Sequence, residues 1–431
     1  MNDILENGEE LRQNYVAILG AGISGNGASA LLKQLGWDHR IYDEQGRAFT
    51  DEEARKCSIV ICSPGFKKDH KWRKIAQDCN KKVITETDFA SRYTKAKIIA
   101  ITGTNGKTTL ATFLTHLWNA VGRTAVCAGN VGVPLSQLVA DGIEEGTTVF
   151  LEASSFQSAD FEFTKPEATL WTNFDEDHID YHKTRENYFY AKAKLLELTA
   201  NGLVMVGRTV NDFAKKIHYK LPVQCEVVDR SEVDNVNFDS EHFLSTYPQR
   251  ENMALAYSFA RKEGIDDLLF RNAIETYTPE PHRLQKIGSV GKATFWNDSK
   301  ATNFSSALAA CKNFKGNLFW IGGGRSKGGI LHEFASKIRP LVQHAFLIGE
   351  SRQALAQLFS EAGFSSVLCN SLEEAVRKAF FTVTEKTNIL LSPGFASFDD
   401  FKNYEHRGNS FKKFVLDLKN ISSMTTPERL A

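Results

Sequence analysis

The stretch that decides the fold is IIAITGTNGKTTLATFLTHLWNA, residues 98–120. Its first five residues are apolar or β-branched, which is typical of a buried strand, and residues 107–120 have the composition of a helix. The glycines at 103 and 106 let the backbone between them curl, so that N–H groups at the start of the helix face an anion. The motif GTNGKTT therefore predicts a phosphate-binding loop, in which Lys107 neutralises phosphate charge and the Thr108 hydroxyl binds Mg²⁺.

Short apolar runs of this kind alternate with helix-like stretches along the whole chain. YVAILG, SIVICSPG, TTVFLEAS, NLFWIGG and NILLSPG are examples. Apolar strands separated by helices indicate parallel sheets covered on both faces. The polar stretch SRYTKAK and the turn-rich TYTPEPHR divide the pattern into three parts. The sequence predicts an α/β fold of three domains: a Rossmann-like N-terminal domain over 1–93, a central P-loop ATPase-like domain over 94–279 and a C-terminal Rossmann-like domain over 280–431.

Composition narrows the class of protein. The 431 residues carry 52 Lys plus Arg and 52 Asp plus Glu, so the net charge is zero and a nucleic-acid partner is not expected. No apolar run reaches the length of a membrane span, and the first ten residues are too polar for a secretory signal. The seven cysteines form no CxxC pair, which favours reduced thiols in a cytoplasmic protein.

A second glycine-rich loop, GAGISG at 20–25, follows the apolar run YVAIL, and Asp43 ends the next predicted strand. This spacing is the dinucleotide-binding fingerprint and would suggest a dehydrogenase. The same loop can hold any diphosphate-linked nucleotide, and a dehydrogenase would leave the GTNGKTT loop unexplained. Ser63-Pro64-Gly65 ends the third strand and is expected to border the same crevice.

Acidic residues follow two strands of the central part. Glu152 ends TTVFL, where a Mg²⁺ ligand belongs in folds with a phosphate loop, although an acid there can also cap a helix. The loop NFDEDHIDYH, residues 173–182, combines hard oxygen ligands with imidazoles, which suits Mg²⁺ or Mn²⁺ better than zinc. Its alternative is a solvated acidic loop.

The C-terminal part carries four polar motifs at predicted strand ends: PHR at 281–283, NDSKATN at 297–303, GGGRSKGG at 322–329 and SPGFASFDDF at 392–401. Lys300 and Thr302 are expected to bind a carboxylate, while Arg283 and Asp298 are expected to face the nucleotide. An apolar stripe in the last helix predicts core packing.

In this order, TGTNGKTT, EASSFQ, NFDEDH, PHR, NDSKATN and GFASFDDFKNYEHRG resemble the Mur ligase family from Tyr15 to about Val415. NDSKATN is similar to the loop of those members that add D-glutamate to UDP-N-acetylmuramoyl-L-alanine. The resemblance implies an ATP-dependent ligase that works through an acyl-phosphate in cytoplasmic peptidoglycan precursor synthesis. It also implies three small-molecule substrates and a monomer.

By that resemblance the first domain holds the uridine diphosphate sugar, and the central domain holds ATP with two Mg²⁺ ions, for which Mn²⁺ is a substitute. The residues that match uridine-nucleotide positions are Ile23, Ser24, Asp43, Gly65 and Asn130. Those that match nucleotide positions are Gly103, Thr104, Asn105, Gly106, Lys107, Thr108, Thr109, Asn252, Arg283 and Asp298.

The resemblance makes Thr108, Glu152, His178 and a carbamylated Lys194 the metal ligands, and Lys107, Glu152, His178 and Lys194 the catalytic set. From the residues alone, Lys194 reads as a surface lysine on a helix. The positions that match D-glutamate contacts are Lys300, Thr302, Lys327, Ser397 and Tyr404; GGGRSKGG offers Arg325 beside Lys327 for the same role.

Two other functions compete with this one. A folylpolyglutamate synthase-like ligase shares the central fold and chemistry, but such relatives lack a UDP-sugar domain where this chain has GAGISG. A nucleotide-dependent switch would keep the phosphate loop without the chemistry. Phosphate release separates a ligase from a switch.

Overall fold

The alternating apolar and helix-forming stretches fold into three sheets, of four, six and six strands, as seen in a computed structural model of the protein. The structure describes residues 14–236, 243–326 and 328–424, without the side chains of residues 180 and 421–424. Adjacent strands run parallel except at one edge of the third sheet. The predicted α/β class with three sheets is confirmed.

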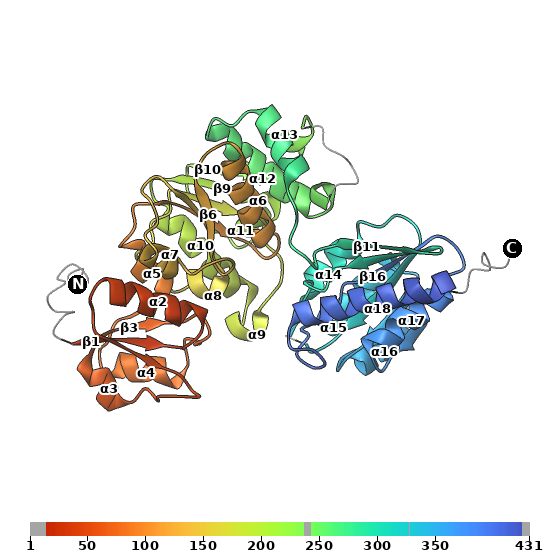
Figure 1. The fold of residues 1–431 in the computed structure, drawn as a ribbon, viewed down its shortest axis with the longest axis horizontal. Helices are drawn as coiled ribbons and strands as arrows, with labels where there is room; N and C mark the ends of the chain where they lie inside the picture. The colour runs from red at the N-terminus through yellow and green to blue at the C-terminus, as the bar shows by residue number, and fades with distance from the viewer. Residues whose placement is uncertain (1–13, 237–242, 327, 425–431) are drawn as a thin grey trace. The chain divides into compact units, whose positions relative to one another are not determined.

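The first sheet has the strand order β2-β1-β3-β4, and its paired strands are parallel. The order reverses between β1 and β3, so the loops that follow these two strands meet at a topological switch point. Figure 1 shows α2 on one side of the sheet and α3 and α4 on the other. The elements are β1 (Tyr15–Leu19), α2 (Ile23–Gln34), β2 (His39–Tyr42), α3 (Asp51–Lys56), β3 (Cys57–Cys62), α4 (Lys71–Asp78), β4 (Val83–Thr85) and α5 (Glu86–Ser91).

The second sheet has the order β10-β9-β8-β5-β7-β6 and is parallel throughout. The strand before the phosphate loop, β5, lies at its centre between β7 and β8, so the loops after these three strands share one edge. The strands are β5 (Lys97–Thr102), β6 (Ala125–Gly129), β7 (Thr148–Glu152), β8 (Ala168–Trp171), β9 (Leu203–Gly207) and β10 (Cys225–Val228). The accompanying helices are α6 (Lys107–Ala120), α7 (Leu135–Ala140), α8 (Ser155–Ser158), α10 (Arg185–Leu198), α11 (Arg208–Lys216), the 3-10 turn η1 (Arg230–Val233), α12 (Gln249–Lys262) and α13 (Asp267–Thr276).

The third sheet has the order β11-β12-β16-β13-β14-β15, with β11 antiparallel to β12. One apolar cluster packs α17 and α18 on one face, and another packs α14, α15 and α16 on the other. Figure 1 shows α18 beside α17. The elements are β11 (Gln285–Val290), β12 (Ala293–Asn297), α14 (Phe304–Cys311), β13 (Leu318–Gly323), α15 (Leu331–Ile338), η3 (Arg339–Leu341), β14 (His344–Ile348), α16 (Arg352–Glu361), β15 (Ser366–Leu368), α17 (Leu372–Thr382), β16 (Thr387–Leu391) and α18 (Tyr404–Met424).

The chain divides into two compact units. The first contains the first and second sheets. The second contains the third sheet together with segment 175–185, which includes α9 (Ile179–His182), and the described residues 243–250, which include η2 (Phe243–Ser245). The predicted ranges place both segments in the central domain, and these ranges stay a prediction. None of the helices among the described residues is long and apolar enough to cross a membrane.

Within the first unit, buried carboxylates on α5 fix the first sheet to the second. Asp88 is fully buried and accepts hydrogen bonds from the backbone N–H groups of Glu162, Phe163 and Thr164 and from the Thr164 hydroxyl, at 2.7–3.2 Å. Glu86, also buried, accepts the Ser136 N–H at 2.7 Å. Since an apolar cluster also runs through both sheets, the two behave as one packed body.

Candidate active site

The phosphate loop predicted at 103–109 joins β5 to α6. Gly103 and Gly106 have φ of +149° and +83°, a conformation that other residues adopt only with strain. A Cβ on Gly106 would also lie 2.1 Å from the Asn252 amide nitrogen. No side chain caps α6, and its first turn carries no acid. The N–H groups and positive dipole end of a 14-residue helix therefore face the loop, which suits a phosphate.

Lys107 folds back over this loop. Its ammonium donates to the carbonyl oxygens of Gly103 at 2.9 Å and Thr104 at 3.0 Å. The next residues, Thr108 and Thr109, are buried at the start of α6. The loop thus places one cation and one buried hydroxyl where a triphosphate and its Mg²⁺ are expected.

Asn173 holds the phosphate loop in shape, and the sequence analysis missed it. Its backbone oxygen accepts the Thr104 N–H at 3.0 Å, and its side-chain amide pairs with both the N–H and the C=O of Asn105, each at 2.9 Å. The Thr172 hydroxyl donates to the Asn105 oxygen at 2.6 Å. The sequence offers one signal for Asn173, which is its position directly after β8, the neighbour of β5. The acidic residues that follow Asn173 form a more conspicuous pattern.

Glu152 ends β7 and is 2% exposed. One carboxylate oxygen, Oε1, accepts a hydrogen bond from the Asn130 amide at 2.8 Å. The other, Oε2, is buried and has no hydrogen-bond partner among the described residues. A buried carboxylate oxygen in that state is costly, and a hard divalent cation would satisfy it. Glu152 therefore fits Mg²⁺, and Thr108 at the head of α6 offers the second protein oxygen that the sequence predicted.

The lysine predicted as a carbamylated ligand, Lys194, does not point to the phosphate loop. It lies on the exposed side of α10, where its ammonium pairs with Glu197 at 3.0 Å. Lys192, two residues earlier, is 1% exposed and donates to the Gly103 oxygen at 2.8 Å. Its Nζ lies 4.8 Å from the centre of the Tyr188 ring, one helical turn away. The helix thus brings Lys192, rather than Lys194, to the phosphate loop, because a two-residue shift turns a helical side chain to the opposite side, and metal binding by Lys194 stays a prediction.

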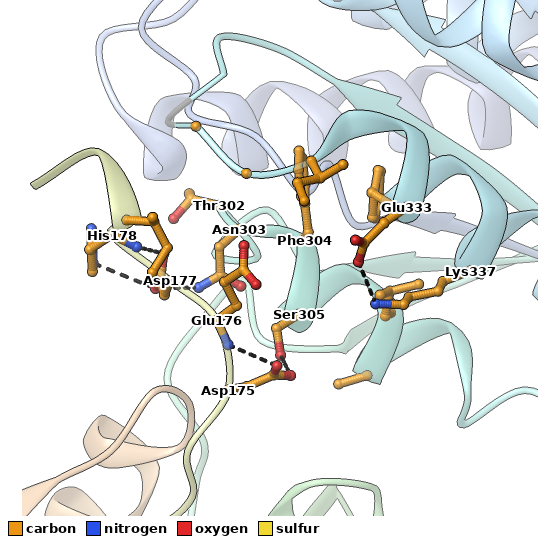
Figure 2. Close-up of a pocket in the computed structure, with 18 of the residues that line it drawn as sticks. Asp175, Glu176, Asp177, His178, Thr302, Asn303, Phe304, Ser305, Glu333 and Lys337 are labelled. Carbon is orange, nitrogen blue, oxygen red and sulfur yellow. Dashed lines mark hydrogen bonds and ion pairs between the residues drawn. The ribbon is translucent and has the colours of Figure 1, made fainter. Parts of the chain in front are cut away.

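The acidic loop that contains His178 belongs to the second unit, where it borders a cavity of about 340 Å³ (Figure 2). Asp175 accepts a hydrogen bond from the Ser305 hydroxyl at 2.6 Å, and Asp177 accepts one from the Asn303 amide at 2.8 Å. The loop is therefore anchored to the start of α14 rather than freely solvated.

His178 itself has a left-handed backbone with φ of +54°, and its Nε2 lies 3.5 Å from an Asp177 oxygen. Across the parts of the chain that the structure describes, no group of three or more His, Cys, Asp or Glu side chains is arranged to hold a metal ion. His178 and Lys194 also belong to different units. The second metal ion predicted between them thus stays a proposal.

Of the described residues predicted to bind the amino acid, only Thr302 lines this cavity; Lys300, Ser397 and Tyr404 are not among its lining residues. Thr302 and Gly394 line it, together with Lys312 and Lys337, of which the latter pairs with Glu333 at 3.2 Å. Ser397, in the loop of Gly394, is 2% exposed. The cavity is thus bordered by cations and hydroxyls as well as by the acidic loop.

Lys300 lies with its ammonium 3.8 Å from the centre of the Tyr404 ring. Burial and a hydrogen bond to Glu405 raise the pKa of the Tyr404 hydroxyl. Arg325 forms a surface ion pair with Glu350 at 2.7 Å. Lys327, its alternative in the sequence, lies outside the described residues.

Asp298 and Arg283, predicted to face the nucleotide, both have partners inside the second unit. The Asp298 carboxylate accepts the Leu284 N–H at 3.1 Å and the Ser392 hydroxyl at 2.7 Å, and burial raises its pKa to about 7. Arg283 lies 3.4 Å from a Glu280 oxygen. Asp298 therefore ties the end of β12 to the loop after β16, and a nucleotide contact by either residue stays a prediction.

The N-terminal loop GAGISG sits at the switch point of the first sheet. Gly20 has φ of +107°, and a Cβ on Gly25 would lie 1.8 Å from the Gly20 oxygen, so only glycine fits the turn. Asp43 accepts the N–H groups of Ala21 and Gln45, each at 3.1 Å, and these bonds lower the pKa of its carboxyl. Asp43 thus shapes the loop from the end of the adjacent strand.

The predicted uridine-nucleotide residues divide between the loops of the first sheet and one loop of the second. Ile23, which starts α2, is 78% exposed, and Ser24 is half-buried. Gly65 is exposed in the loop after β3, which pairs with β1. Asn130 lies after β6 in the second sheet, where its amide binds Glu152. An exposed apolar side chain beside an open helix start offers a surface for a nucleotide base and its diphosphate.

Comparisons with known proteins agree with this architecture. Residues 101–265 match the Mur ligase middle domain, and residues 282–395 match the Mur ligase glutamate ligase domain. The UDP-N-acetylmuramoylalanine–D-glutamate ligase of Thermoanaerobacter pseudethanolicus is 30% identical over 457 aligned positions, which cover 95% of this chain and 100% of that protein. The protein of that name from Leuconostoc mesenteroides is 28% identical and covers 93% of this chain and 97% of its own length.

Solved structures with the same fold include the UDP-N-acetylmuramate-alanine ligase of Thermotoga maritima, with a TM-score of 0.57 and 14% identity over 94% of this chain and 99% of that one. The MurF ligase from Thermotoga maritima in complex with ADP has a TM-score of 0.57 and 15% identity over 98% and 99% of the two chains. At such identities the likeness concerns the fold alone.

The phosphate loop, the buried acid beside it and the near full-length relatives define the class of this protein as an ATP-dependent ligase. Within that class, the chain belongs to the Mur ligase family.

Proposed function

We propose that this ligase joins D-glutamate to UDP-N-acetylmuramoyl-L-alanine at the expense of ATP, in the synthesis of peptidoglycan precursors. The observation that carries the proposal is the 30% identity to a ligase of that name over 95% of this chain and 100% of that protein. The N-terminal GAGISG loop supports the proposal, because it offers a site for the diphosphate of a sugar nucleotide.

ATP is assigned to the phosphate loop, with its terminal phosphates on the N–H groups of α6 and on Lys107. Thr108 and Glu152 would hold Mg²⁺, or Mn²⁺ as a substitute, and the ion would supply positive charge to the transferring phosphoryl group. Lys107 adds charge that needs no reorganisation, because its ammonium is already held over the loop by two carbonyl oxygens.

The sugar nucleotide is assigned to the first sheet, with its diphosphate at GAGISG and Asn130 near its far end. Asn130 links the two sites, because its amide binds Glu152. The carboxylate of the L-alanyl group attacks the γ-phosphorus of ATP, the bond to the β–γ bridging oxygen breaks, and ADP leaves. The acyl-phosphate that forms then accepts the amine of D-glutamate. Loss of the amine proton and expulsion of inorganic phosphate complete the amide.

D-Glutamate is assigned to the second unit, at the loops that carry Lys300, Thr302, Ser397 and Tyr404. A lysine ammonium and three hydroxyls match the two carboxylates of this substrate. Lys327 or Arg325 is proposed to add a further cation.

A second Mg²⁺ ion is proposed at His178 with a carbamylated lysine, and the geometry favours Lys192 over Lys194 for that lysine. The Lys192 Nζ contacts the phosphate loop from a buried position, whereas the Lys194 ammonium faces Glu197. Carbamylation would turn the buried cation into an anionic oxygen ligand, which a hard metal ion accepts.

Phosphate release tests the proposal. Full-length enzyme with ATP and Mg²⁺ is expected to release phosphate only when UDP-N-acetylmuramoyl-L-alanine and D-glutamate are both present. Lys107→Ala is the matched control, because it removes the loop cation and is expected to abolish turnover without unfolding the chain. Release that required a different amino acid would overturn the specificity. No release under any combination would favour the nucleotide-dependent switch.

A further inference from the structure

The last helix, α18, contains a buried arginine for which the proposed reaction has no role. Arg407 is 1% exposed, although arginine is almost never fully buried in proteins unless it is paired. Burial lowers the pKa of its guanidinium to about 10, which still leaves it charged at neutral pH. No ion pair of Arg407 occurs within the described ranges, so backbone and hydroxyl oxygens take the place of a carboxylate partner.

The guanidinium reaches two separate loops at once. Its Nε donates to the Ser299 hydroxyl at 3.0 Å, and its Nη2 donates to the Ser299 carbonyl oxygen at 2.9 Å. Nη1 and Nη2 both donate to the Phe395 carbonyl oxygen at 3.2 Å. Only the planar, five-donor fork of arginine can satisfy partners in both directions from one buried position.

These two loops are the ones to which the amino-acid substrate is assigned. Ser299 lies next to Lys300 in the loop after β12, and Phe395 lies two residues before Ser397 in the loop after β16. The strands β12 and β16 are parallel neighbours, so both loops leave the sheet at the same edge. The two loops also touch directly, since the Gly394 N–H donates to the Ala301 oxygen at 2.9 Å.

The residues around Arg407 strengthen this connection. The Ser299 hydroxyl donates onward to the Tyr404 carbonyl oxygen at 2.8 Å, which ties the loop to the start of α18. The Asn297 amide donates to the Gly408 oxygen at 3.0 Å and lies 3.0 Å from His282 Nδ1. A Cβ on Gly408 would lie 2.2 Å from that same nitrogen. These hydrogen bonds and close contacts thus hold the start of α18 against both loops.

We propose that Arg407 is a positioning residue for the amino-acid substrate: its guanidinium sets the spacing between the loop of Lys300 and Thr302 and the loop of Ser397. The inference rests on the proposed function, since it takes D-glutamate as the ligand of those loops. Arg407 does not touch the substrate. It acts on substrate binding through the backbone of the two loops.

The test uses Arg407→Lys, which keeps a charge but cannot reach Ser299 and Phe395 together, and Arg407→Met, which removes the charge as well. A displacement of about 1 Å at a binding group can cost on the order of 100-fold. We therefore expect the KM for D-glutamate to rise about tenfold or more in Arg407→Lys and further in Arg407→Met. The KM value for the sugar nucleotide should stay within about twofold, because its GAGISG loop lies in the first unit. Arg377→Lys, at an exposed ion pair on α17, is the matched control and should leave all three constants unchanged.

Ser299→Ala covers the case in which the Arg407 variants do not fold. It deletes one acceptor of the guanidinium and is expected to raise the KM for D-glutamate about threefold, with unchanged KM for the sugar nucleotide. If Arg407 had only a structural role, its replacement would lower the melting temperature and the amount of active enzyme, and the three KM values would stay as they are. The inference is overturned if the KM for D-glutamate stays within twofold of the wild-type value in the folded Arg407 variants. If those variants do not fold, the same result in Ser299→Ala overturns it. Failure of the proposed function itself would appear differently, as wild-type enzyme that shows no D-glutamate-dependent turnover.

Discussion

Replacing Glu152 with glutamine should make the metal-free protein more stable and nearly inactive at the same time. The reason is that the two carboxylate oxygens of Glu152 differ in their hydrogen bonding. Oε1 accepts a hydrogen bond from Asn130, whereas Oε2 is buried and lacks a partner among the described residues. A ligand for Mg²⁺ is expected to carry such a cost when the ion is absent.

The magnitude follows from the contacts. A buried polar atom without a partner costs about 1–3 kcal/mol, and a charged one costs more. In Glu152→Gln the amide oxygen can keep the bond from Asn130, while the negative charge disappears and an unpaired NH₂ group remains. We expect the free energy of unfolding to rise by about 1–2 kcal/mol without metal, which corresponds to a few degrees in melting temperature for a unit of this size. Asn130→Ala is the matched control and should destabilise by about 1–3 kcal/mol, because both carboxylate oxygens then lack partners.

The assay compares unfolding in EDTA with unfolding in Mg²⁺ and a non-hydrolysable ATP analogue. A ligand at a hundredfold excess over its Kd stabilises a protein by about 2.7 kcal/mol. Wild type should gain this stabilisation, and Glu152→Gln should gain much less, so the order of stability reverses between the two conditions. If the variant were less stable than wild type in EDTA, or gained as much as wild type from Mg²⁺ and the analogue, Glu152 would not be a metal ligand.

Three further predictions follow from other contacts. Asp88→Asn should destabilise the first unit by about 2–4 kcal/mol in urea unfolding, because an amide NH₂ group would then face one of the four donors that now bind the buried carboxylate. An unchanged midpoint would contradict the role of Asp88 in joining the first sheet to the second. Lys192→Gln should lower kcat by about 100-fold or more, whereas Lys194→Gln should stay within about threefold, and the reverse order would restore Lys194 as the ligand. Asp298 has a folded-state pKa of about 7, above its usual 3.8, so the stability it contributes is complete below pH 4 and is lost as pH rises to 7. Asp298→Asn should therefore flatten the fall in unfolding free energy across that window, by about 4 kcal/mol, and a slope equal to that of wild type would contradict the assignment.

Some positions in the site could be predicted because residues that directly follow a strand lie at a known edge of its sheet. Gly103 and Glu152 each follow an apolar run, and the carboxyl ends of parallel strands meet at one edge of a sheet. Asp43 was found in the same way, at the end of the strand beside β1. For such residues no knowledge of side-chain packing was needed.

Residues on helices were harder, because a sequence does not reveal which side of a helix is buried when polar residues occur on both. Lys192 and Lys194 stand in one helix-like stretch with a weak apolar pattern, and only packing against the phosphate loop distinguishes them. The apolar stripe of the last helix correctly gave Phe411 and Val415 as core residues. It could not indicate Arg407, since a lone arginine between apolar positions is usually solvated.

Loops that are held by distant segments were the third difficulty. Asn173 contacts the phosphate loop from the end of the neighbouring strand β8, 68 positions away, and Asp175 is bound by Ser305, 130 positions away. The position of Asn173 after a strand was visible in the sequence, but neither pairing was, because hydrogen bonds between remote segments depend on how the strands and helices are arranged.

The most direct test of the central claim is the mass of the product. Full-length enzyme would be incubated with ATP, Mg²⁺, UDP-N-acetylmuramoyl-L-alanine and an equimolar mixture of D-glutamate, L-glutamate and D-glutamine, each with a distinct isotope label. We predict one product, the sugar nucleotide enlarged by a single glutamyl residue with the label of D-glutamate, formed in equal amount with ADP. A product that carried another label, or ADP formed without any amide product, would contradict the claim that this chain is a D-glutamate-adding ligase.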